Sequence, residues 1–275
     1  MEFNELDPGS YTVDVEATLS GALSGVGSAE VAVTEGETAS CSVLMNRVYT
    51  ADAAAEYIES LEAGSYKVIV AGAIDDAGIE GIKTALNENN INKPLVSLDL
   101  GRTTGLSSIG AAKFQNCTAL SAIVLPEGIG SIDENAFEGC TSLASVTIPD
   151  TVTAIGQYAF CDCSALKSVV IPNNVTKISA AVFQSCTSLE SAVISNTATS
   201  IGIDAFNSCT SLKTVVIPVS ITSIGDKAFE SCGSLETVYY GGTKAEWGGI
   251  KFVGSSSNEL SNVTIICSNG NTTTP

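Results

Sequence analysis

The stretch AFEGCTSLASVTIP, residues 136–149, returns twenty-three residues later as AFCDCSALKSVVIP, residues 159–172. Each copy has a Phe, then a Cys three residues on, then a Leu after three more, and each ends in a β-rich run closed by proline. This shared order of residue types indicates one structural unit that the chain uses more than once.

The same unit runs through six copies at an unbroken spacing of 23 residues. Its Phe positions are Phe114, Phe137, Phe160, Phe183, Phe206 and Phe229. The Cys positions three residues later are Cys117, Cys140, Cys163, Cys186, Cys209 and Cys232. An Ile stands five residues before each Phe, and a Leu stands six residues after it. A period in the twenties is typical of a leucine-rich solenoid, whose coils bury their apolar faces by stacking on one another.

The residues of one coil predict how that coil folds. The segment LKSVVIP, residues 166–172, predicts a strand with Leu166 and Ile171 facing inward. Pro172 has no N–H and suits the point where the strand leaves the hydrogen-bonded ladder. Phe160 fills the far side of the coil, so we expect the six Phe side chains to be the rungs of one buried column.

The nine cysteines invite a chemical interpretation. Zinc sites need closely spaced Cys pairs, usually with His, and the chain contains no His. Only Cys161 and Cys163 lie close together in sequence, and Cys161 is outside the repeat register. Stacked coils bring neighbouring cysteines within disulfide distance, but their parallel Cβ vectors disfavour a bridge. We predict small buried thiols that stay free and resist labelling until the protein unfolds.

Composition excludes several classes of function. The 30 acidic and 12 basic residues give a formal net charge of −18, which opposes binding to nucleic acid or to an anionic membrane. Without His, neither a Ser-His-Asp nor a Cys-His site can form within one chain. Asp75 and Asp76 are adjacent, which predicts a helix N-terminus rather than a calcium loop. We therefore predict no catalytic, metal or cofactor site and no cofactor.

The segment IGQYAFCDCSALKSVVIPNNVTKI, residues 155–178, closely resembles the BspA-like class of bacterial leucine-rich repeats. The segment LETVYYGGTKAEWGGIKF, residues 235–252, resembles the closing cap of that family. The resemblance covers residues 50–267 and implies a parallel β-sheet on the concave face of the array.

The sequence thus predicts an α+β repeat solenoid, a leucine-rich repeat array that is capped at both ends and preceded by a small β-strand module. The module, residues 1–49, resembles part of an immunoglobulin- or prealbumin-like sandwich and shows three strand-like segments. The segment over residues 50–94 resembles the lead-in seen before such arrays, which implies a helix–strand–helix N-terminal cap there, and the array is expected over residues 95–240. The C-terminal cap is expected over residues 241–267, and a flexible tail over residues 268–275.

The outward residues of the predicted strands form rows. One row contains Asp99, Val124, Thr147, Val170, Val193, Val216 and Tyr239. The row beside it contains Ser97, Ala122, Ser145, Ser168, Ser191, Thr214 and Thr237. Soluble monomers seldom expose a long apolar stripe unless it binds something, although exposed β-branched residues also simply suit a strand. The candidate ligand-binding residues are Val124, Thr147, Val170, Val193, Val216 and Tyr239.

A further row alternates in charge from coil to coil. Its members are Lys167, Glu190, Lys213 and Glu236. Neighbours one coil apart can form ion pairs, which favours the correct register of the stack over a slipped one. We interpret this row as structural.

The resemblance implies a non-enzymatic protein-binding or adhesion module of a bacterial cell-surface or secreted protein, with the ligand on the concave sheet. The implied partner is a macromolecule, such as a host matrix protein, a host receptor or a bacterial surface component. The alternative is a structural spacer or a self-associating element of a larger surface protein. We expect a monomer that does not insert into a membrane. The start MEFNELDPGS is acidic and unlike a secretory signal, so either the protein stays inside the cell or the chain is part of a longer precursor. We expect the longer precursor, because the chain begins within what looks like a β-module already under way.

Overall fold

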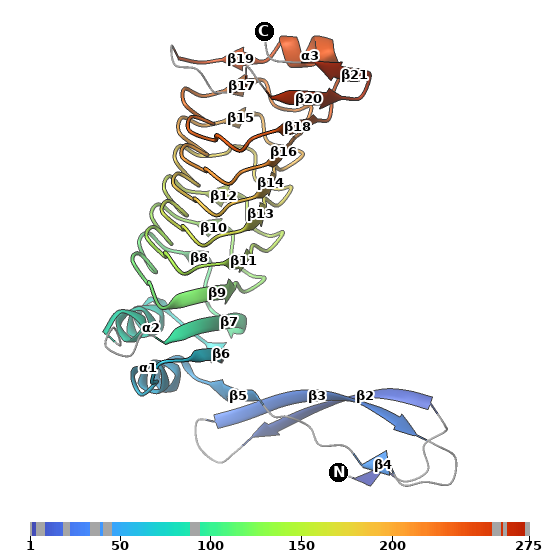
Figure 1. The fold of residues 1–275 in the computed structure, drawn as a ribbon. Helices are drawn as coiled ribbons and strands as arrows, with labels where there is room; N and C mark the ends of the chain where they lie inside the picture. The colour runs from blue at the N-terminus through green and yellow to red at the C-terminus, as the bar shows by residue number, and fades with distance from the viewer. Residues whose placement is uncertain are drawn as a thin grey trace.

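The computed structural model describes residues 2–3, 9–18, 23–33, 39–40, 46–88, 94–254, 260 and 263–272. Figure 1 shows an elongated molecule whose coils rise in a nearly straight stack from a base of two helices. A long β-hairpin lies at the N-terminal end of this stack and a short helix at the C-terminal end (Figure 1). The predicted leucine-rich solenoid is confirmed, and the curvature of the stack is slight.

Each coil contributes one strand to a main parallel sheet. The strands are β9 (Leu120–Val124), β11 (Ser145–Thr147), β13 (Ser168–Val170), β14 (Ser191–Val193), β16 (Thr214–Ile217), β18 (Thr237–Tyr240) and β20 (Thr264–Cys267). Neighbouring strands pair in parallel with equivalent residues of successive coils opposite one another. We call the solvent side of this sheet the main-sheet face.

The opposite side of each coil carries two-residue strands. They are β8 (Ser108–Ile109), β10 (Ser131–Ile132), β12 (Ala154–Ile155), β15 (Ser200–Ile201), β17 (Ser223–Ile224) and β19 (Lys251–Phe252). All of these pair in parallel with their neighbours, and a single bridge from Ile178 to Ile201 continues the second stack. Strand pairing therefore stacks the Ile of successive coils from Ile109 to Ile155 and again from Ile178 to Ile224, and no bridge between Ile155 and Ile178 is present among the described residues.

The main sheet consists of two parts. One has the strand order β11-β9-β7-β6-β5-β3-β2, in which β7 is Leu95–Thr104, β6 Ser65–Ala73, β5 Asn46–Tyr49, β3 Leu23–Val33 and β2 Gly9–Thr18. The other has the order β13-β14-β16-β18-β20-β21, in which β21 is Gly270–Thr272. No strand ladder joins β11 to β13 in the described residues, but the amide of Lys167 donates to the carbonyl of Ala144 at 3.3 Å. The stack therefore continues across this junction with fewer backbone hydrogen bonds.

The N-terminal segment merges with the cap through one sheet. Strands β2 (Gly9–Thr18) and β3 (Leu23–Val33) form an antiparallel hairpin, and β1 (Glu2–Phe3) pairs with β4 (Ala39–Ser40). Strand β5 (Asn46–Tyr49) pairs antiparallel with β3 on one edge and parallel with β6 on the other. The hairpin is thus hydrogen-bonded to the sheet that carries the repeats.

The cap places two helices beside parallel strands. Its elements are α1 (Ala51–Glu59), β6 (Ser65–Ala73), α2 (Asp76–Glu88) and β7 (Leu95–Thr104). The hydroxyl of Thr50 accepts a hydrogen bond from the Ala53 amide, and the carboxylate of Asp75 accepts one from the Gly78 amide at 2.9 Å. The capping role predicted for the Asp75 region is confirmed.

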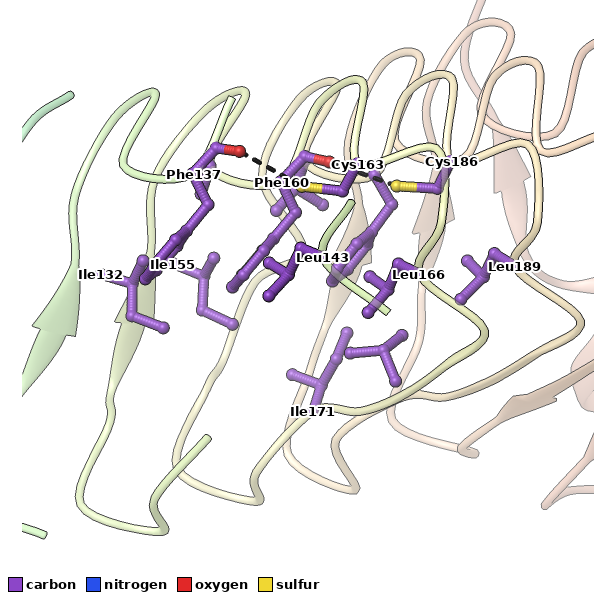
Figure 2. Packing of buried hydrophobic residues seen from close by; sticks show 14 of the residues in the cluster. Ile132, Phe137, Leu143, Ile155, Phe160, Cys163, Leu166, Ile171, Cys186 and Leu189 are labelled. Carbon is purple, nitrogen blue, oxygen red and sulfur yellow. Dashed lines mark hydrogen bonds between the residues drawn. The ribbon is translucent and has the colours of Figure 1, made fainter. Parts of the chain in front are cut away.

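The six repeating Phe side chains form the predicted column in the core. All six are fully buried, and successive ring centroids lie between 5.2 and 5.5 Å apart with nearly parallel planes. Figure 2 shows Phe137 and Phe160 side by side, with Leu143 and Leu166 also repeating from one coil to the next. Each ring therefore packs against the equivalent ring of the next coil.

The loop around each Phe contains two left-handed backbone positions. The first is Ala112, Asn135, Tyr158, Ala181, Asp204 or Lys227, and the second is Asn116, Gly139, Asp162, Ser185, Ser208 or Ser231. Such conformations are unfavourable for most side chains, so the surrounding structure has to impose them. Backbone hydrogen bonds between coils do so, because the amides of Asn135 and Gly139 donate to carbonyls of the next coil at 3.0 and 2.9 Å.

The C-terminal cap contains α3 (Lys244–Gly248) and a final hairpin. Thr243 and Glu246 form a capping box at the start of α3. Residues 270–272, predicted to belong to a flexible tail, form strand β21 (Gly270–Thr272), which pairs antiparallel with β20. The Asn269-Gly270 step supplies the tight turn that this pairing needs, because Gly270 has a φ of 114°.

Candidate functional site

The strand register brings the candidate ligand-binding residues into one line on the main-sheet face. Val124 lies opposite Thr147, and on the other side of the junction between β11 and β13, Val170, Val193, Val216 and Tyr239 lie opposite one another in register. Their side chains are exposed by 38% at Val124, Val193 and Val216, by 45% at Tyr239 and by 66% at Val170. We call these six residues the apolar row.

Val170 is the most exposed member of the apolar row because of its place in the sheet. It lies on β13, the first strand after the junction at which the ladder is interrupted. Its neighbour Val193 is paired on both sides, by Val170 and by Val216, and is much less exposed. The missing ladder between β11 and β13 therefore leaves the side chain of Val170 more exposed than that of Val193.

The row extends one strand further than the sequence predicted. Tyr239 on β18 pairs with Ile266 on β20, whose side chain is half-buried. The 23-residue period could not locate Ile266, because the cap inserts additional residues and the spacing from Tyr239 becomes 27. The available signal in the sequence was the β-rich run TIIC, residues 264–267, which predicts one more strand after Tyr239.

Polar groups border the apolar row. The hydroxyl row of Ser168, Ser191, Thr214 and Thr237 runs beside it in the same register. At the N-terminal end, Asp99 lies opposite Val124 and makes an ion pair of 3.5 Å with Lys67. The apolar surface therefore begins beyond a charged pair.

The sign-alternating row contains one close ion pair. Nζ of Lys213 lies 2.7 Å from a carboxylate oxygen of Glu190. The hydrogen bond and charge of Lys213 lower the pKa of Glu190, and the same contact with Glu190 raises the pKa of Lys213. Lys167 and Glu236, at the two ends of the row, make no salt bridge within the part of the chain that the structure describes.

The repeating cysteines are buried and free, as predicted, and they also make a hydrogen bond that the sequence analysis missed. Each thiol from Cys140 to Cys232 donates to the carbonyl oxygen of the Phe 26 residues earlier, at 2.9–3.2 Å. Figure 2 shows two of these bonds, from Cys163 and from Cys186. Cys41 lies outside the described residues.

The buried thiols are poorly suited to nucleophilic chemistry. Burial raises the pKa of Cys117 to about 12 and raises the pKa of Cys140 and Cys186 well above the ordinary value. Cys161, outside the register, also has a pKa raised to about 12, first by burial and then by the neighbouring carboxylate of Asp162. The thiolate is the reactive form, so these groups stay unreactive near neutral pH.

The described residues hold no cluster of His, Cys, Asp and Glu that could bind a metal ion. An open depression of about 570 Å³ lies where α1 and α2 begin, lined by Asp52, Asp75 and Gly105 among others. The carboxylate of Asp75 is occupied with capping α2, and Asp52 would repel an anion at these helix ends. The longest described helix has 13 residues, and none is both long and apolar enough to span a bilayer.

A parallel stack of 23-residue coils with a buried Phe–Cys–Leu pattern defines a leucine-rich repeat protein. Six copies of the BspA type leucine rich repeat region match the sequence, over residues 107–236 and 177–268. These segments together span more than half of the chain. The chain therefore belongs to the BspA-type leucine-rich repeat family.

One solved structure supports the same fold, and two others are also similar to the chain. The T. pallidum leucine-rich repeat protein is 30% identical over 57% of this chain and 72% of its own, with a TM-score of 0.51. A leucine-rich repeat protein from Bacteroides ovatus is 18% identical over 90% of this chain and 70% of its own, with a TM-score of 0.44. A leucine rich cell surface protein from Faecalibacterium prausnitzii is 16% identical over 90% of this chain and 99% of its own, with a TM-score of 0.26.

No curated protein matches the chain. Leucine-rich repeat proteins are generally modules that bind macromolecules and are typically non-catalytic. The site that remains for such a role is a surface, and the main-sheet face is the one on which exposed apolar residues are aligned by strand pairing.

Proposed function

We propose that this protein is a non-enzymatic adhesion module of a bacterial cell-surface or secreted protein, which binds a macromolecular ligand through the apolar row. The observation that supports this proposal is the exposure of Val170, Val193, Val216 and Tyr239 in one line on consecutive strands. The chain is otherwise strongly acidic, so an uncharged apolar line is a distinct feature of its surface.

The face is rigid before it binds. Strands β14, β16 and β18 are paired on both sides, so their backbones lose little conformational freedom when a ligand docks. The β-branched Val side chains also have few rotamers to lose. Binding energy from burying these side chains would therefore offset a small ordering cost.

The chemistry of the face favours a protein ligand with exposed apolar side chains and some hydroxyl- or amide-bearing groups. Ser191 and Thr214 offer hydrogen-bonding hydroxyls next to Val193 and Val216. A net charge of −18 repels nucleic acid and anionic lipid. Host matrix proteins, host receptors and bacterial surface components are the ligand classes to test.

A binding screen tests the proposal. The wild-type chain is presented to matrix proteins, mucins, glycans and whole bacterial cells, beside a variant with Val170→Asp, Val193→Asp and Val216→Asp. Three carboxylates would have to be desolvated in the interface, so we expect binding to be lost. Circular dichroism and thermal unfolding establish that the variant remains folded.

A second triple variant controls for the added charge. Tyr158, Ile203 and Val253 are also exposed apolar residues, but they lie outside the main sheet. Replacing all three with Asp changes the net charge equally and is expected to leave binding intact. If both triple variants bind as the wild type does, or lose binding equally, the assignment of the ligand to the apolar row is wrong.

A further inference from the structure

The sign-alternating row is complementary to itself when its order is reversed. Along the array it reads Lys167, Glu190, Lys213, Glu236, which is plus, minus, plus, minus. Read from the other end it is minus, plus, minus, plus. Strand pairing places its neighbours at regular spacing, since the residues that follow them are in register. A second row of the same kind in reversed order would therefore meet an opposite charge at all four positions.

We propose that the main-sheet face binds a second copy of this chain, face to face, about a twofold axis that runs along the strands between β14 and β16. Such an axis reverses the order of the coils while each row faces its own counterpart, as an isologous interface requires. This inference rests on the proposed function, because it names a second copy as the partner of the same face. It replaces the monomer expected from the sequence.

The axis pairs the two charges that lack a salt bridge within the described chain. Lys167 faces Glu236 of the second copy, and symmetry generates this pair twice. Glu190 and Lys213, which already contact each other at 2.7 Å, face Lys213 and Glu190 of the second copy. The interface would therefore contain four cations and four anions from this row, with no like charges opposite one another.

The apolar row also matches itself about this axis. Val193 faces Val216 of the second copy at the centre of the interface. Val170, which is 66% exposed, faces Tyr239, the largest side chain of the row. Thr147 faces Ile266. The exposed side chain of Val170 is thus placed against the Tyr239 ring, which is large enough to cover it.

Charge alternation selects one register. Sliding one copy by a single strand would set Glu190 against its own counterpart and Lys167 against Lys213, so that every pair of facing charges becomes repulsive, while Glu236 faces the uncharged Ala144. Like charges opposite one another in an interface oppose association and suppress the wrong register. The net charge of −18 opposes association at long range, but the row itself is neutral, and a Debye length of about 8 Å at 0.15 M salt screens the rest.

The size of the face sets the strength of the contact. From Thr147 to Ile266 the line spans about 24 Å at about 4.8 Å per strand, and the bordering rows make it only a few residues wide. Such an area is below the roughly 1,200 Å² of a standard stable interface. We therefore expect a reversible dimer that dissociates on dilution.

Sedimentation velocity and light scattering at 0.15 M salt test the proposal over a wide range of concentration. The wild-type mass is expected to rise with concentration from 28.1 kDa toward twice that value. Lys167→Glu and Glu236→Lys each create two like-charge pairs, so each should weaken the dimer at least about tenfold, although they shift the net charge in opposite directions.

Two combinations restore the complementary charges. The double variant Lys167→Glu/Glu236→Lys exchanges the signs within each pair and should dimerise as the wild type does. A mixture of the two single variants should form a heterodimer, because each partner then meets opposite charges. Lys177→Glu, an exposed change next to the second stack of strands, controls for net charge and should have no effect.

The outcomes separate this inference from the proposed function. A wild type that stays monomeric at every concentration, or single reversals that leave the dimer intact, would overturn the inference. Failure of the mixture to associate would also contradict the pairing of Lys167 with Glu236. If the wild type is monomeric yet the Val→Asp triple variant loses an external ligand, the proposed function stands without the dimer. If the face binds neither a second copy nor any ligand, both are wrong.

Discussion

Raising the pH from 8 to 10 is expected to destabilise the array through its buried thiols. Burial raises the pKa of five of the repeating cysteines above the ordinary value of 9.0, to about 12 at Cys117 and well above 9.0 at the other four. In this pH range the folded chain keeps protons that the unfolded chain releases. Alkaline pH therefore favours the unfolded chain, and the contribution of the thiols is complete only below pH 9.

The magnitude follows from the unfolded state alone, as long as the folded pKa lies well above 10. One pH unit above an unfolded pKa of 9.0 corresponds to about 1.4 kcal/mol for each thiol. Five such thiols lower the free energy of unfolding by about 7 kcal/mol at pH 10. This is comparable with the 5–15 kcal/mol typical of a whole domain, so we expect a steep fall in stability.

Urea unfolding at pH 8 and pH 10, under a reductant that keeps the thiols reduced, measures the effect. Cys163→Ala removes one titrating group. Between pH 8 and pH 10 its free energy of unfolding should therefore fall by about 1.4 kcal/mol less than that of the wild type. Val169→Ala changes a buried side chain that does not titrate. Its free energy of unfolding should fall between pH 8 and pH 10 by as much as that of the wild type. An equal pH-dependent loss in wild type and Cys163→Ala would refute the reasoning.

Two further predictions concern packing between coils. Phe160 lies between rings whose centroids are 5.2 and 5.5 Å away, so Phe160→Ala should lower the free energy of unfolding by about 3–5 kcal/mol in urea; a loss below about 1 kcal/mol would contradict its role as a rung. A Cβ added at Gly156 would lie 2.5 Å from the Glu134 nitrogen, so Gly156→Ala should cost about 1–3 kcal/mol and lower the melting temperature. Gly233 has open space, and Gly233→Ala should change little; equal effects would argue against close contact at Gly156.

The core was predictable from the sequence because its positions repeat with the same residue types. Ile132, Phe137 and Leu143 stand in one repeat, and equivalent residues stand 23 positions further on in the next. All three are fully buried, and the same spacing correctly predicted which residues lie opposite one another in the main sheet. A buried position accepts few residue types, so the pattern persists where the structure requires it.

The features that the sequence did not predict depend on contacts rather than on residue type. The thiol of Cys163 donates to a carbonyl 26 residues earlier, and a buried Cys gives no sign of whether such a carbonyl is within reach. The left-handed position at Tyr158 is occupied by Ala, Asn, Asp or Lys in other coils, so no residue type marks it. Ile266 was missed because the cap departs from the period.

The exposed rows have the same spacing as the core, because both follow the stacking of the coils. The charges of the sign-alternating row are therefore evenly spaced. Glu190 and Lys213 form an exposed pair, and exposed pairs stabilise a fold only weakly, whereas the buried Phe column already fixes the register of the coils. Lys167 and Glu236 make no salt bridge in the described chain, and their charges act on Glu190 and Lys213 only at longer range. Regular alternation of exposed charges stabilises a single stack only weakly and is better suited to selecting the register between two stacks, where a shift of one strand leaves no attractive pair in the row.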